Sequence, residues 1–342
     1  MFRNLTTRED DILNGYIYVG ETLCILDCPS PLFTIREWDM FYIMSIVMGG
    51  ISMIASLFLI ITYSPIINRK INKTSLAILS MAVSIFLMSS TDGYQIWDVD
   101  RGFTKYCPDK GRYARQSDRS CLATGLLFQY GSVSAIMWWS VLAFDLWMSI
   151  KKKKTGKRQI FYYFIGINII SIVFTLAPIG HNQYAYNTAS IGCWLSELKY
   201  QLAFFFIPLA IVLTFGSVFI VLILYEIYKL SDIVEKKTLK KYIRPSILII
   251  LMCLEFYYMV IYYSYITKDE KNVEKRLVNY IICLFENENK PGGTDKCHFK
   301  TLSPSAQFIF LFSYRIMGLE GLIFYGFTTQ TKKIWKKSYL FN

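Results

Sequence analysis

The residues of this chain that could do chemistry are not arranged for catalysis. His181 and His298 are the only histidines, and no cluster of Cys, His, Asp or Glu has the spacing of metal ligands. No serine-centred elbow or phosphate-binding glycine loop occurs in the sequence. The sequence therefore predicts a protein that is not an enzyme and that holds no cofactor and no metal.

Two other sets of residues could act chemically. The chain has eight cysteines, which could form disulfides. Charged residues also lie within long apolar stretches, among them Asp145, Glu255, Arg315 and Glu320. An ionisable side chain in such a stretch is costly to bury and is a candidate functional residue. The role of each depends on the elements that position it.

Those elements are seven long apolar blocks in a chain of 342 residues that is 54% hydrophobic, with a mean hydropathy of +0.33. About 20 apolar residues in a helix cross the roughly 30 Å of membrane hydrocarbon. The second block is rich in Ser and Met, yet no charge interrupts it from Ser75 to Thr91. We predict an all-α membrane protein with a tail at 1–40, one domain at 41–327 and a second tail at 328–342. The predicted spans are 41–64, 74–97, 122–150, 160–179, 202–228, 243–266 and 305–327.

The orientation follows from the distribution of the net charge of +12. The loops at 65–73, 151–158 and 229–242 and the tail after Phe327 are dense in Lys and Arg. Because such loops stay in the cytosol, we predict an outer N-terminus and a cytosolic C-terminus, with the basic loops against anionic lipid rather than nucleic acid. The first twenty residues have no apolar core of a signal peptide. Either the first span is the targeting signal, or this start is incomplete.

The cysteines gather on the predicted outer side, where oxidation would let them pair. A Cys121–Cys193 disulfide would tie the second outer loop to the third span, and a local Cys283–Cys297 disulfide would close the last loop. Cys107 would then pair with either Cys24 or Cys28, which the sequence does not distinguish; the alternative is that some of these are free thiols. Asn4-Leu5-Thr6 is a glycosylation sequon on the same side.

Two of the charged residues in the spans suit an ion pair. Counted at 1.5 Å per residue, Glu255 lies about 16 Å above Arg244, and Arg315 lies about 15 Å below the outer end of its helix. Both therefore fall near mid-membrane on helices that follow each other directly in the chain. We predict that Glu255 and Arg315 pair, either as a static contact or as one that breaks on activation.

With these residues placed, the chain resembles the frizzled/smoothened family of seven-span receptors. The third span is the strongest likeness, because residues 134–142 match the small-residue, double-tryptophan stretch of the family. Residues 191–194 and the fifth span resemble the corresponding loop and helix. After the seventh span, residues 330–335 resemble the tail motif Lys-Thr-x-x-x-Trp, with Thr331 and Trp335 retained and Gln330 in place of lysine.

The resemblance implies further properties. Family members usually carry a large cysteine-rich outer domain, for which the forty residues before the first span are too short. Arg244 matches a basic residue that meets an aromatic side chain at the inner end of the seventh helix, where this chain has Phe327. Such a cation–π contact contributes about 0.5–2 kcal/mol. Thr331 and Trp335 could instead belong to a short amphipathic helix on the membrane surface.

The functional expectation is a plasma-membrane receptor. The resemblance implies an extracellular or lipid-like ligand and a cytosolic partner, either a heterotrimeric G protein or an adaptor. A multi-pass transporter or channel is the alternative. It would normally show broken helices and inverted repeats, and no repeat is visible in this sequence.

Overall fold

The computed structural model describes most of the chain. The residues that it describes are 8–18, 25–30, 32–68, 72–96, 106–109, 111–151, 157–231, 236–268, 278–280, 282–283, 303–336 and 338.

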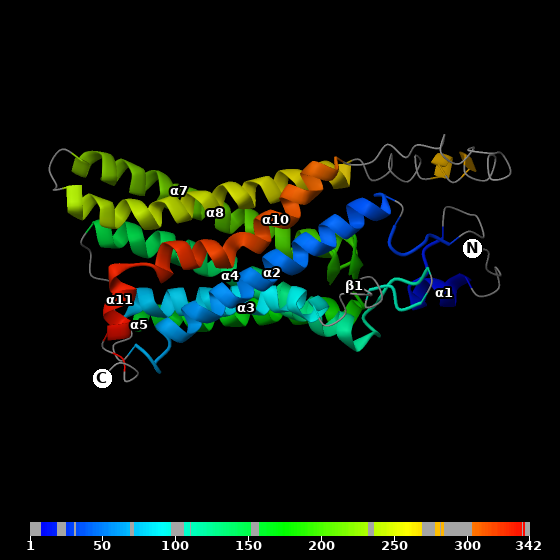
Figure 1. Ribbon diagram of the computed structural model, residues 1–342, viewed down its shortest axis with the longest axis horizontal. Coiled ribbons are helices and arrows are strands. Elements are labelled where there is room, and N and C mark those ends of the chain that lie inside the picture. The colour runs from blue at the N-terminus through cyan, green and yellow to red at the C-terminus, as the bar shows by residue number, and fades with distance from the viewer. Residues whose placement is uncertain are drawn as a thin grey trace.

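The core of the structure is an elongated bundle of long helices (Figure 1). Among the described residues, seven helices are long and apolar enough to cross a membrane, which confirms the predicted seven-helix membrane fold. The fourth and fifth spans contain short 3-10 (η3) and π-helical (η4) turns, and the seventh ends in the π-helical turn η6. The elements are α2 (Ile35–Tyr63), α3 (Lys73–Ile96), α4 (Arg119–Ile150), α5 (Lys157–Leu176) with η3 (Ala177–His181), α6 (Leu198–Gln201) with η4 (Leu202–Phe206) and α7 (Ile207–Ser231), α8 (Lys236–Lys268), and α10 (Pro304–Gly321) with η6 (Leu322–Gly326).

Several helices extend beyond the apolar blocks. α2 begins at Ile35 because Thr34 caps it: the Thr34 hydroxyl accepts a bond from the Glu37 N–H, and the Glu37 carboxylate accepts one from the Thr34 N–H. This reciprocal arrangement satisfies two backbone donors at the helix start. α8 likewise begins at Lys236, within a predicted loop. Hydropathy locates only the part of a helix that suits hydrocarbon, so it places the ends too far inward.

The low hydropathy of α3 has a structural cause. α3 is the most deeply buried of the seven spans, whereas α5 and α7 are the least buried and are more apolar than α3. Its serines are satisfied inside the bundle: Ser84 donates to Ser134 of α4 at 2.8 Å, and Ser89 donates to Ser52 of α2 at 3.1 Å. Small polar residues at membrane helix contacts allow close approach and hydrogen bonding. α3 therefore faces protein rather than lipid.

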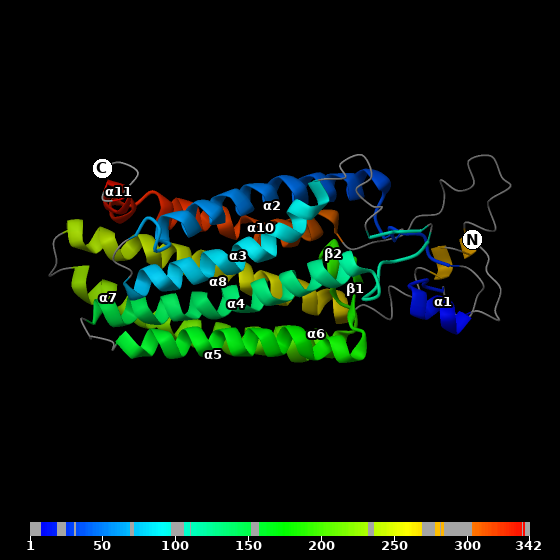
Figure 2. The same cartoon turned by 90° about the horizontal axis from the view of Figure 1, so that it is seen from below.

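The two ends of the bundle differ. At one end lie α1 (Arg8–Asn14) and an antiparallel hairpin of β1 (Tyr184–Asn187) and β2 (Gly192–Leu195); we call this the hairpin end. At the opposite end α11 (Thr329–Lys336) lies across the bundle axis (Figure 1). The turned view in Figure 2 places α11 beside α2 and the hairpin beside the far end of α4. The structure thus separates a hairpin end from an α11 end.

Gly318 of α10 packs directly on Ser52 of α2. The Gly318 N–H donates to the Ser52 hydroxyl at 3.0 Å, and a Cβ atom on Gly318 would overlap the Ser52 hydroxyl and carbonyl. Gly166 of α5, in contrast, has no heavy atom within 4 Å of its would-be Cβ.

We therefore expect Gly318→Ala to lower the thermal stability of the purified protein. Overpacking costs about 1–3 kcal/mol, which exceeds the gain of about 1 kcal/mol in helix propensity. The matched control, Gly166→Ala, should leave the melting temperature unchanged or raise it. Equal melting temperatures for the two variants would contradict the close α2–α10 contact.

Candidate functional site

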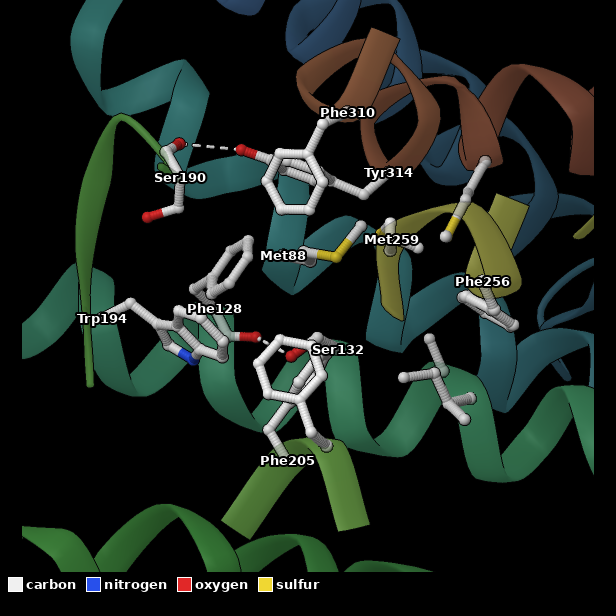
Figure 3. A pocket seen from close by; sticks show the side chains of 14 residues that line it. Met88, Phe128, Ser132, Ser190, Trp194, Phe205, Phe256, Met259, Phe310 and Tyr314 are labelled. Atoms are coloured by element: carbon white, nitrogen blue, oxygen red, sulfur yellow. Dashed lines mark hydrogen bonds between the residues drawn. The ribbon is translucent and has the colours of Figure 1, made fainter. Parts of the chain in front are cut away.

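A cavity lies inside the bundle beneath the β1–β2 hairpin (Figure 3). Its volume is about 40 Å³ and its lining is almost wholly apolar, with the serines and Tyr314 as exceptions. We call it the hairpin cavity. It is bounded by α3, α4, the hairpin, η4, α8 and α10 through Met88, Phe128, Ser132, Ala135, Ile136, Ser190, Trp194, Phe205, Phe206, Phe256, Met259, Phe310, Tyr314 and Met317. A change in its contents would therefore be felt by every one of these elements.

The hairpin is fastened to the bundle by covalent and polar contacts. A disulfide joins Cys193 of β2 to Cys121 of α4. The indole of Trp194 donates to the Gln129 side chain at 2.6 Å, and that side chain donates onward to the Phe204 carbonyl of η4 at 3.0 Å. Buried polar groups need such partners. These contacts consequently hold the hairpin, α4 and the start of the fifth span together.

A buried ion pair borders the cavity. The guanidinium of Arg315 donates to both carboxylate oxygens of Asp92, at 2.8 and 3.1 Å, and the two side chains are only 2% and 6% exposed. Arg315 also donates to the Ser190 carbonyl at 3.4 Å, and the Tyr314 hydroxyl donates to the same carbonyl at 2.8 Å (Figure 3). The pair thus connects α3, α10 and the turn of the hairpin.

This geometry corrects the predicted Glu255–Arg315 pair. α10 packs on α2 and α3 as well as on α8, and Arg315 lies on the face towards α3. Helices that follow each other in sequence are neighbours, but sequence order does not say which face each residue occupies. Asp92 was missed although it directly follows the uncharged stretch and lies inside the block at 74–97. An acidic residue inside a predicted span is itself a candidate for a buried ion pair, and this criterion would have identified Asp92.

Glu255 has a different neighbour. Its carboxyl group lies close enough to that of Glu320 on α10 for the two to interact. α10 runs towards the α11 end, so Glu320, which follows Arg315, lies nearer that end than the Asp92–Arg315 pair. Glu255 lies at the level of Glu320, because the two carboxyl groups interact. The two ionisable clusters of α10 are therefore separate.

The predicted contact of Arg244 with Phe327 stays a prediction. Arg244 lies near the start of α8, but its side chain is outside the described residues. Phe327 directly follows η6, and its side chain is 62% exposed.

The tail residues Thr331 and Trp335 lie on α11 and contact α2. Thr331 is buried and lies 3.3 Å from the Tyr63 hydroxyl. The Trp335 indole donates to the Thr62 hydroxyl at 3.2 Å and its ring stacks on Phe58. The lysines at 332, 333 and 336 are exposed. α11 is thus an amphipathic helix fixed to the bundle by the two residues that the tail motif retains.

The structure brings together several of the candidate cysteines. Besides the Cys121–Cys193 disulfide, it joins Cys107 to Cys28, the choice that the sequence left open. Cys283 is in a disulfide, while Cys24, Cys297 and the sequon residue Asn4 lie outside the described residues. The Cys283–Cys297 pairing and glycosylation at Asn4 stay predictions.

The hairpin end is further secured by Arg112. Its guanidinium binds both carboxylate oxygens of Asp118, the N-cap of α4, at 3.0 and 3.1 Å. Burial disfavours the charge on Asp118, but the bonds from Arg112 and from the Arg115 N–H outweigh burial and lower the pKa of Asp118. Arg112 also donates to the Asn14 carbonyl at the end of α1. The N-terminal segment is thereby tied to the start of α4.

Comparison with known proteins agrees with this architecture. The model of the Frizzled/Smoothened family membrane region matches residues 32–340. Over its full length the chain is 55% identical to the Frizzled/smoothened-like sans CRD protein C of Dictyostelium discoideum, covering 67% of that protein. It is 48% identical to proteins D and E of the same series, covering 78% and 77% of them. The chain is a multi-pass membrane protein that belongs to the Frizzled/Smoothened receptor family.

The Asp92–Arg315 pair yields a prediction about stability. Removing one member of a buried pair leaves an uncompensated charge, at a cost of about 3–5 kcal/mol. Arg315→Met should therefore lose most surface expression and melt at a lower temperature. Adding Asp92→Asn should restore part of both, because it removes the stranded charge.

The control separates the two pairings. Glu255→Gln in the Arg315→Met background should restore neither surface expression nor melting temperature. Rescue by Glu255→Gln, or normal expression of Arg315→Met alone, would contradict the pair described above.

Proposed function

We propose that this protein is a plasma-membrane receptor that passes an external signal to a cytosolic partner, with a heterotrimeric G protein as the preferred candidate. The hairpin end faces outward and the α11 end faces the cytosol. The charge distribution supports this orientation, because the described helix ends that flank the loops with an excess of Lys and Arg over Asp and Glu lie at the α11 end of the bundle.

The observation that carries the proposal is the double hydrogen bond to the Ser190 carbonyl. Tyr314 and Arg315 of α10 both donate to it, and Ser190 lies in the hairpin turn over the cavity. A ligand that displaced the hairpin turn would alter the bonds that hold α10. Since α10 continues through η6 to α11, a change at one end has a continuous route to the other.

The lining of the cavity indicates the ligand class. Its aromatic and methionine side chains favour an apolar body. The adjoining polar pocket contains Asp92, Thr91 and Arg315, which could bind a polar head. With a volume of about 40 Å³ in this state, the cavity would have to widen for a ligand of lipid size. We propose that binding couples this widening to movement of α8 and α10.

A transporter or channel remains the alternative class. Transporters commonly place half-helix ends and unwound backbone at mid-membrane. Among the described residues, Pro245 is near the start of α8, and the π-helical turns η4 and η6 lie near helix ends. These positions favour a receptor that bends at its ends over a transporter that is broken in the middle.

The orientation is directly testable. An epitope tag before residue 8 should bind antibody on intact cells, whereas a tag after residue 338 should bind only after permeabilisation. Accessibility of both tags from one side would contradict the seven-span receptor topology.

The coupling proposal is tested by proximity between a tag on the C-terminal tail and Gα subunits in living cells. The wild type should exceed an unrelated seven-helix protein at equal expression. Ala135→Leu, which fills the cavity, should change the signal by about fivefold or more, because site couplings are typically 1–3 kcal/mol. Ala210→Leu adds the same group on the exposed face of α7 and should not change the signal.

Failure takes two forms. Wild-type proximity no greater than that of the unrelated protein, for every Gα subunit, would contradict G-protein coupling. Movement of ions or solutes by purified protein in liposomes would favour the transporter or channel.

A further inference from the structure

Two glutamates face each other inside the bundle, and no cationic side chain of the described residues pairs with either. Glu255 is on α8 and Glu320 is on α10, and their carboxyl groups lie within interaction distance of each other. Glu320 is only 4% exposed. The Oε2 atoms of both residues are buried, and no hydrogen-bond donor of the described residues reaches either.

Several described charged groups on neighbouring elements have other partners. Arg315 and Asp92 are paired with each other, and Lys151 is paired with Glu226 at 2.7 Å. The carboxylate of Asp145 on α4 accepts a bond from Thr74.

The neutral titratable groups also have partners. The Tyr63 hydroxyl of α2 donates to the Tyr325 carbonyl of η6. Cys253 on α8 is 3.7 Å from Ser217 of α7. Among the described residues, none of the groups named in this and the preceding paragraph acts on Glu255 or Glu320, and the two carboxyl groups interact with each other.

This arrangement requires a proton. Ionised carboxylates have acceptors but no donor, so two of them cannot hydrogen-bond to each other. Two negative charges in contact in a low-dielectric interior also repel strongly. A single proton on either residue supplies the missing donor and removes one charge.

We propose that Glu255 and Glu320 share a proton that fastens α8 to α10, and that loss of this proton releases the contact. The protonated pair is one carboxylic acid bonded to one carboxylate; deprotonation sends one proton to solvent and leaves two carboxylates that repel. We call the pair the acid latch. It does not depend on the proposed receptor function, because it concerns the bundle without ligand.

The position of the acid latch suits a moving contact. Glu320 is followed, after Gly321, by the π-helical turn η6, which also packs against α8. Widened π turns are often found at functional sites. Separation of α8 from α10 at this level would open the bundle towards the α11 end.

The test measures the melting temperature of the full-length purified protein in lipid nanodiscs as a function of pH. In the wild type, the melting temperature should fall as pH rises through the range in which the pair loses its proton. Glu320→Gln and Glu255→Gln should each flatten this decline, since a glutamine amide donates to the remaining carboxylate without a titrating proton. Glu226→Gln, which alters the surface pair with Lys151, should keep the wild-type profile.

Infrared spectroscopy gives a second readout that does not require stable variants. The wild type at neutral pH should show the carbonyl stretch of a protonated carboxyl, and this band should disappear at high pH. In Glu226→Gln the band should remain, and in either latch variant that folds it should be lost. Absence of the band from the wild type, or a steep pH decline retained in both latch variants, would overturn the proposal.

Discussion

The arrangement of the bundle depends on a bidentate ion pair buried between α3 and α10. A charge in the hydrocarbon region is tolerated only with a partner, and Arg315 satisfies this condition with Asp92 at 2.8 and 3.1 Å. Because the same guanidinium donates to the Ser190 carbonyl, the pair also holds the hairpin turn over the cavity. This one ion pair therefore constrains α3, α10 and the hairpin turn together.

The remaining polar groups of the bundle follow the same rule on a smaller scale. Serine hydroxyls cross between helices, as from Ser84 to Ser134, and a glycine N–H on α10 donates to Ser52. Without water as an alternative partner, each of these contacts fixes the spacing of two helices. α3 is accordingly rich in serine and deeply buried, whereas α5 and α7 are apolar and largely exposed on the outside of the bundle.

The two ends of α10 carry different kinds of contact. Towards the hairpin end, Tyr314 and Arg315 donate to the carbonyl of the hairpin turn. Towards the α11 end, Glu320 contacts Glu255, and the chain continues through η6 into α11. α11 is in turn bound to α2 through Thr331 and Trp335. One helix thus connects the cavity, the acidic pair and the retained tail motif.

The sequence by itself determined the number of spans and the family, because membrane helices are long apolar blocks and the motifs of this family are local in sequence. It also indicated the Cys121–Cys193 contact, since both cysteines flank the same end of the bundle. It did not determine the partners of Arg315 and Glu255. Those depend on which face of each helix meets which neighbour, and rotation of a helix about its axis is set by the packing of the whole bundle. Only the tertiary structure could therefore pair Arg315 with Asp92 and leave two acids together.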